Sequence, residues 1–423
     1  MEEIRVPVHD NSPSIEYTLR PISYTSWFMG VGIAHPLKCP KFVTIVIRII
    51  HLVICTVILT MFIRNNISHL SIDSVVEFFY IIDRMIFFVA AYYYIYHGIR
   101  QYNTWPKLMD KIKELDQKIR KETHMNDEPV KVMEAVAILM TFVCCPLIPI
   151  VRYLYDFLTS NYIAIDSLFS DYMMAQSMIN SFFFGVVVYV LYYRYKMINK
   201  MLGHLELSDA RLITLKIRRI KELHNDICDL VIVINDIHGF YLLLFSANCF
   251  SIVTTALFCG YMVFMLNSYK VALIYCIISV IYTIQFGVIC WACKLARQEF
   301  EKTKTIMCAI SLKCQSMKFD KPNDTRNQLS LEVRPSLEDA NSEQNFNWSR
   351  NWNYVAMENL LRKIMARNDV NTEINDFFIQ LQHHRVSFTA CDFFEMNNNL
   401  FCAFIGVIST YLIIFIQFTN KSE

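Results

Sequence analysis

The sequence predicts an all-α membrane protein with seven transmembrane helices. Hydrophobic residues make up 54% of its 423 residues and charged residues 18%, whereas about a quarter of an average soluble domain is charged. A helix of about 20 apolar residues can cross a hydrocarbon layer of about 30 Å. Windows of that kind occur at 42–63, 75–96, 132–151, 172–193, 239–266, 271–292 and 400–418.

The basic residues predict the orientation of these helices. Segment 1–41 and the second, fourth and sixth connecting loops hold nearly all of the 40 Lys and Arg residues. Because basic loops stay in the cytoplasm, the N-terminus is expected inside the cell and the C-terminus outside, the reverse of a G-protein-coupled receptor. The remaining loops and the tail, 419–423, each hold one basic residue: Arg64, Arg152, Lys270 and Lys421.

The predicted domains follow from this orientation. A polar stretch at 316–350 is expected to be disordered, and helices near 354–366 and 374–384 are expected to form a cytoplasmic anchor. Apolar residues recur every three or four positions from Ile213 to Ile234, which predicts an amphipathic helix that continues into the fifth span. The predicted segments are a cytoplasmic N-terminus at 1–41, spans one to four at 42–193, a cytoplasmic helical loop at 194–238, spans five and six at 239–292, a cytoplasmic loop at 293–397, and the seventh span at 398–418.

Charged groups and a glycosylation sequon mark the first two spans. Asp83 and Arg84 lie inside the second span, where opposite charges usually pair or face a cavity. They are therefore candidates for function. Asn66-Ile67-Ser68 is a sequon in the first outer loop, which predicts glycosylation of Asn66.

The seventh span combines apolar length with polar groups on one face. Thr410, Ile413, Ile414 and Gln417 are three or four residues apart and share a helical face. Such a face suits a helix that lines a water path. The alternative is a bundle helix whose polar groups contact neighbouring helices.

The end of this span carries a recognisable signature. Thr410-Tyr411, five apolar residues and then Gln417-Phe418 resemble the TYhhhhhQF signature of the insect gustatory receptors. Upstream, Phe388-Thr389-Ala390-Cys391 resembles the FTAC segment of that family. Asp392 begins the next run at a position where glycine is usual.

Two further stretches carry the same resemblance. Leu223-His224, Leu230 and Ile234-Asn235 resemble the LHxxL…IN pattern that precedes the fifth span of gustatory receptors. Lys294-Leu295-Ala296-Arg297 resembles the basic exit from the sixth span.

The resemblance implies a gustatory receptor of sensory neurons that acts at the plasma membrane as a ligand-gated, non-selective cation channel. It implies a homo- or hetero-tetramer in membrane lipid, with the seventh span around a central pore. On this basis the gate is predicted at Ile413, Ile414, Gln417 and Phe418, with Thr410 on the same face. Tyr411 is predicted to pack against a neighbouring span.

A small-molecule tastant is expected to bind in the outer half of the bundle. Aromatic rings with scattered polar groups suit a small, partly polar ligand, although tyrosines also form ordinary interfacial belts. The residues do not choose between sugar, bitter compound and another tastant. The candidate ligand residues are Tyr80, Asp83, Arg84, Gln176, Asn180, Tyr261, Tyr275 and Tyr282.

Other functions are less consistent with the sequence. It has no GxSxG, HExxH or P-loop motif, so no enzyme activity and no cofactor or metal are predicted. The net charge of +2 gives no argument for nucleic-acid binding. A metabotropic, G-protein-linked receptor is the main alternative and is disfavoured by the orientation. An odorant-receptor-type channel is the other.

Overall fold

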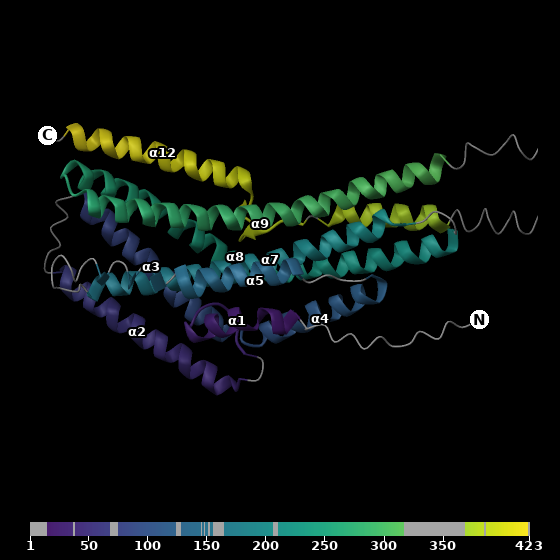
Figure 1. Cartoon of the computed structure of the whole chain (residues 1–423), viewed down its shortest axis with the longest axis horizontal. Helices are drawn as coiled ribbons and strands as arrows, with labels where there is room; N and C mark the ends of the chain where they lie inside the picture. The colour runs from purple at the N-terminus through teal and green to yellow at the C-terminus, as the bar shows by residue number, and fades with distance from the viewer. Residues whose placement is uncertain are drawn as a thin grey trace, which may run out of the picture. The chain divides into compact units, whose positions relative to one another are not determined.

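The computed structural model describes residues 15–36, 39–67, 75–123, 128–144, 146–147, 149–150, 153–154, 165–205, 210–316, 369–384 and 386–421. This part of the chain is nearly all helical, in agreement with the predicted fold class (Figure 1). The labelled elements are α1 (Ile15–Phe28), α2 (Lys41–Ile67), α3 (Val75–Arg100), α4 (Thr104–Glu122), α5 (Glu128–Leu139), the π-helix η1 (Met140–Cys144), α7 (Ile165–Gly203), α8 (Ala210–Met265), α9 (Tyr269–Ser316), β1 (Thr389–Ala390), β2 (Phe394–Glu395) and α12 (Asn398–Lys421).

Five helices in the described part of the chain are long and apolar enough to cross a membrane. They are α2, α7, α8, α9 and α12, and they correspond to five of the seven predicted windows. The predicted second span, 75–96, lies in the helix α3 but is not among the five. The third, 132–151, covers most of α5 and all of η1 and then runs beyond the continuously described residues. The structure therefore supports a multi-pass membrane protein.

Two compact units make up the chain. Unit 1 consists of Met1–Arg194, Asp229–Arg297 and Ser387–Glu423, and unit 2 consists of Tyr195–Cys228 and Gln298–Val386.

α8 is 56 residues long, far more than the ~20 needed to cross a bilayer. The predicted continuation of the amphipathic helix into the fifth span is thus confirmed.

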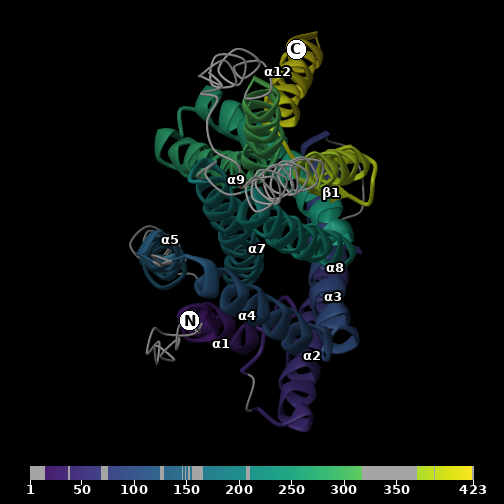
Figure 2. The ribbon, with the colours of Figure 1, turned by 90° about the vertical axis from the view of Figure 1, so that its right-hand side faces the viewer.

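In unit 1, α7 is the most interior of the candidate spans. Of its most apolar window, 83% is buried by other parts of the protein, against 17% for α2 and 11% for α12. Apolar surface left open on α2 and α12 must meet lipid or another chain in a membrane. Figure 2 shows α2 beside α3 and α1 beside α4, and both pairs are in contact.

A buried ion pair ties α4 to α7. Arg194 Nε lies 2.6 Å from Asp116 Oδ1, and Arg194 Nη2 donates to Asp116 Oδ2 at 3.0 Å. The exposed fractions of the two side chains are 1% and 9%. Both charges are therefore held in a two-point contact out of water.

The segment that follows α1 packs among the helices of unit 1. The Arg48 side chain of α2 is buried, and its Nη2 donates to the carbonyl oxygens of Val31 at 3.2 Å and Gly32 at 2.8 Å. A Cβ atom on Gly98 of α3 would lie 2.7 Å from Cζ of Arg48. Glycine at this position therefore lets α3 approach the buried guanidinium.

One short hairpin precedes α12, a feature that the all-α prediction did not include. β1 pairs antiparallel with β2, with Thr389 opposite Glu395. The turn residues Cys391 and Asp392 have φ values of 51° and 60°, a left-handed conformation that favours glycine. Aspartate tolerates it better than most residues, and Asp392 Oδ1 accepts a hydrogen bond from Thr389 Oγ1 at 2.9 Å. This explains how aspartate stands where the resembled family has glycine.

Unit 2 contains the second predicted anchor helix, which is helical at 369–383. Its Glu373 accepts hydrogen bonds from Arg218 Nη2 at 2.6 Å and from Lys221 Nζ at 2.8 Å. The first predicted anchor helix and nearly all of the predicted disordered stretch lie outside the described residues. These contacts join the amphipathic part of α8 to the anchor helix within unit 2.

Candidate functional site

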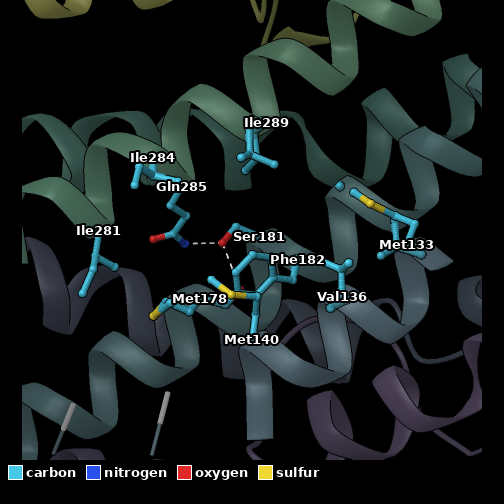
Figure 3. A pocket seen from close by; sticks show the side chains of 14 residues that line it. Met133, Val136, Met140, Met178, Ser181, Phe182, Ile281, Ile284, Gln285 and Ile289 are labelled. Carbon is cyan, nitrogen blue, oxygen red and sulfur yellow. Dashed lines mark hydrogen bonds between the residues drawn. The ribbon is translucent and has the colours of Figure 1, made fainter. Parts of the chain in front are cut away.

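A cavity of about 200 Å³ lies between α5, η1, α7 and α9 in unit 1 (Figure 3). The helices α5, α7 and α9 each contribute residues three and four apart, so one face of each forms the wall, and η1 contributes Met140. An apolar cavity of about 150 Å³ can hold benzene, so this one has room for a slightly larger molecule. The wall consists of Met133, Val136, Ala137, Met140, Met178, Ser181, Phe182, Gly185, Val186, Ile281, Ile284, Gln285, Val288 and Ile289.

Two side chains of this wall, Ser181 and Gln285, are polar. Gln285 Nε2 donates to Ser181 Oγ and to the carbonyl oxygen of Ser177, the latter at 3.3 Å. Ser181 Oγ lies 2.9 Å from that same carbonyl oxygen. The arrangement can hold a mostly apolar molecule and orient it by few polar contacts.

Gly185 gives the cavity part of its volume. A Cβ atom on this residue would meet no heavy atom within 4 Å outside the helix's own backbone. Because it lines the cavity, any larger side chain there would extend into space that a ligand could occupy.

None of the predicted ligand residues whose side chains the structure describes lines this cavity. Gln176 is buried and donates from Nε2 to the Met29 carbonyl oxygen at 3.0 Å and to the Tyr172 hydroxyl at 2.7 Å. Asn180 is buried next to Gly32, whose Cβ position lies 2.8 Å from Asn180 Oδ1. Both residues therefore face the segment after α1. Gln176 also lines a smaller hollow between α3, α7 and α8 that leaves no room for a water molecule.

Four other candidates differ in how deeply they are buried. Tyr282 is fully buried, Tyr261, Tyr275 and Arg84 are half-buried, and none of these lines the 200 Å³ cavity. The side chains of Tyr80, Asp83 and Asn66 lie outside the described residues. The pairing of Asp83 with Arg84 and the glycosylation of Asn66 thus stay predictions.

Sequence reasoning missed Ser181 and Gln285. Gln285 shares one helical face with Ile281, Ile284, Val288 and Ile289, because these residues are three or four positions apart or adjacent. This spacing is a sequence signal for one face of α9. That signal was weak, because Ser279 and Thr283 are also polar and lie on other faces of the same span, so the pattern does not mark which face borders a cavity.

On α12, the predicted pore face is open in the single chain. Thr410, Ile413, Ile414 and Gln417 are exposed, with Ile413 at 55% and Ile414 at 37%. The opposite face of α12 packs on the rest of unit 1, where Phe404 and Ile408 are buried. The Phe418 side chain lies outside the described residues.

Aromatic contacts fix the packed face of α12. The Tyr411 ring meets Phe250 of α8 edge-on, with 5.8 Å between centroids. Phe404 lies 4.4 Å from Phe286 of α9. A Cβ on Gly287 would come within 3.2 Å of the Phe401 ring. The α9 helix therefore contacts α12 with residues adjacent to those that line the cavity.

Two of the resembled motifs meet in unit 1. Asn235 Nδ2 donates to the Ser387 carbonyl oxygen at 2.7 Å, and Asn235 Oδ1 accepts from the Thr389 backbone N–H at 3.3 Å. A Cβ on Gly239 would lie 3.2 Å from the backbone nitrogen of Cys391. The asparagine of the IN element thus joins α8 to the FTAC segment by side-chain hydrogen bonds to the backbone.

Comparisons with known proteins agree with these features. The profile of the 7tm Chemosensory receptor family matches residues 19–322 and 357–421. Putative gustatory receptor 28b of Drosophila melanogaster is 35% identical over 66 residues, which is 16% of this chain and 14% of that receptor.

Solved structures show the same fold. The insect olfactory receptor OR5 from Machilis hrabei aligns with a TM-score of 0.52 and 11% identity over 95% of this chain and 98% of OR5. A structure of OR5 in complex with eugenol aligns equally well, over 96% of this chain. With the family profile and the gustatory relative, the resemblance predicted from the C-terminal motifs is confirmed, and the chain belongs to the 7tm chemosensory receptor family.

Proposed function

We propose that this protein is a gustatory-type receptor that acts as a ligand-gated, non-selective cation channel. The observation that carries the proposal is the position of α9, one face of which lines the cavity while Phe286 and Gly287 pack on α12. A ligand that binds better when α12 is in its open arrangement shifts the population toward that arrangement. A small change in the cavity wall can therefore act on α12 through direct packing.

The cavity favours a small, mostly apolar ligand over a sugar. A sugar carries many hydroxyl groups, and burying each without a partner is costly. The wall offers Ser181 and Gln285 among aliphatic, aromatic and thioether side chains. That OR5 has been solved with eugenol supports a ligand of this class for a protein of the same fold.

The exposed face of α12 suits a pore formed by several copies. In a symmetric tetramer, Thr410, Ile413, Ile414 and Gln417 would each recur as a ring around one axis. Rings of isoleucine can close a pore by dewetting, and amide oxygens can contact a passing cation. The gate is placed at Ile413, Ile414, Gln417 and Phe418, in a homo- or heteromer. The receptor has seven spans and a cytoplasmic N-terminus, and it acts in the plasma membrane of sensory neurons.

The ligand site is tested by filling the cavity. In Gly185→Leu the new side chain occupies space that a ligand needs, so every agonist response should be lost while surface expression remains. Gly203→Leu is the matched control. A Cβ on Gly203 of the same helix also meets no heavy atom within 4 Å outside the helix's own backbone, and this residue does not line the cavity. If Gly185→Leu keeps the wild-type response to all agonists, the ligand binds elsewhere.

A further inference from the structure

The two polar side chains of the cavity wall have well-defined hydrogen-bonding roles. Ser181 and Gln285 are 1% and 4% exposed. The Ser177 carbonyl oxygen can only accept, so the Gln285 amide atom that faces it at 3.3 Å must be the nitrogen. This contact fixes which way the amide points.

The serine hydroxyl is consistent with that assignment. Its proton can go to the carbonyl oxygen of Ser177 at 2.9 Å or of Met178 at 3.0 Å. Its lone pairs then accept from Gln285 Nε2. Both protons of the Gln285 amide nitrogen are therefore used, one by the Ser177 carbonyl oxygen and one by Ser181 Oγ.

The remaining polar atom of the Gln285 side chain is its amide oxygen. Gln285 Oε1 is buried and has no hydrogen-bond partner. Figure 3 shows it turned away from Ser181, on the side of Ile281, another residue of the wall. A buried acceptor without a partner is costly, and a ligand that supplies a donor removes that cost.

We propose that the cavity selects molecules that donate a hydrogen bond, with Gln285 Oε1 as the acceptor that determines this specificity. The inference rests on the proposed ligand site. The ligand class is a small neutral alcohol, phenol or N–H compound with an otherwise apolar body. Molecules that carry an acceptor without a donor are disfavoured, because their oxygen would face the oxygen of Gln285. Charged amines are disfavoured because none of the described lining residues is acidic.

The experiment measures binding of three probes to the purified full-length receptor by isothermal titration calorimetry in detergent. 4-Ethylphenol carries a donor, 4-ethyltoluene has the same shape without a polar group, and acetophenone carries only an acceptor. The wild type should bind 4-ethylphenol about 10-fold more tightly than either other probe. Gln285→Met removes the acceptor at similar size and should reduce that preference to about 2-fold or less.

The outcomes separate this inference from the proposed site. If Gly185→Leu binds all three probes as the wild type does, the cavity is not the ligand site and the inference falls with it. A second outcome is that the wild type binds 4-ethylphenol and 4-ethyltoluene with equal affinity and that Gly185→Leu binds neither. That result would support the cavity as the ligand site and would overturn the selection for hydrogen-bond donors. A preference for 4-ethylphenol that survives unchanged in Gln285→Met would also overturn the role of Gln285. The comparison of probes on the wild type needs no variant and does not depend on how Gln285→Met folds.

Discussion

Replacing Asp116 with alanine should destabilise unit 1 by about 3 kcal/mol. The change leaves the Arg194 guanidinium, 1% exposed, without the carboxylate that it contacts at two points. We use the lower end of the range for broken buried pairs, because the guanidinium also lies 5.7 Å from the Tyr193 ring centre. A loss of this size lowers the folded-to-unfolded ratio by roughly 100-fold. It is measured as the shift in the midpoint of unfolding by SDS in mixed micelles.

A double variant and a surface control sharpen that test. Asp116→Leu with Arg194→Met removes both charges and should recover most of the stability, because no unpaired charge remains. Glu114→Ala on the same helix breaks only an exposed pair with Lys118 and should change the midpoint little. If Asp116→Ala unfolds at the same SDS fraction as Glu114→Ala, the argument from the buried charge is wrong.

Three further predictions concern other parts of the chain. The hydrogen bond from Lys221 holds the pKa of Glu373 below its usual value. The stabilisation from this carboxylate is therefore full at neutral pH and is lost as the pH falls through that lowered pKa. Unfolding midpoints measured against pH should show this loss, and Glu373→Gln should remove it. Gly239→Ala crowds the backbone of the hairpin turn. It should reduce ligand-evoked current, measured by patch clamp, more than surface expression, measured by surface labelling. Equal reductions of the two would assign Gly239 a purely structural role. A tag after Lys421 should be labelled on intact cells and a tag in 316–350 only after permeabilisation, whereas the opposite pattern would refute the orientation.

Much of the fold follows from local sequence signals. Apolar length located five helices, and the spacing of isoleucines and leucines before the fifth span predicted the continuous helix α8. The C-terminal signature identified the family. These signals are strong because length, periodicity and motif depend on neighbouring residues.

The cavity and the hairpin depend on tertiary contacts, which local signals do not contain. Gln285 is one of several polar residues in a mostly apolar span, and only the packing of α5 and α7 makes it part of a wall. Gln176 and Asn180 were predicted to face a ligand, and they lie against the segment after α1, whose apolar content gives no sign of this contact. The turn at Asp392 lacks the glycine that would have marked a left-handed residue.

The claim that this protein is itself a ligand-gated channel is tested most directly by reconstitution. The purified chain alone is placed in a planar lipid bilayer without G proteins, and current is recorded as 4-ethylphenol is added. We predict cation currents that open with 4-ethylphenol, persist in Gly203→Leu and are absent in Gly185→Leu. A protein that binds 4-ethylphenol by calorimetry but passes no current in the bilayer, while its response in cells requires G-protein signalling, would contradict the account.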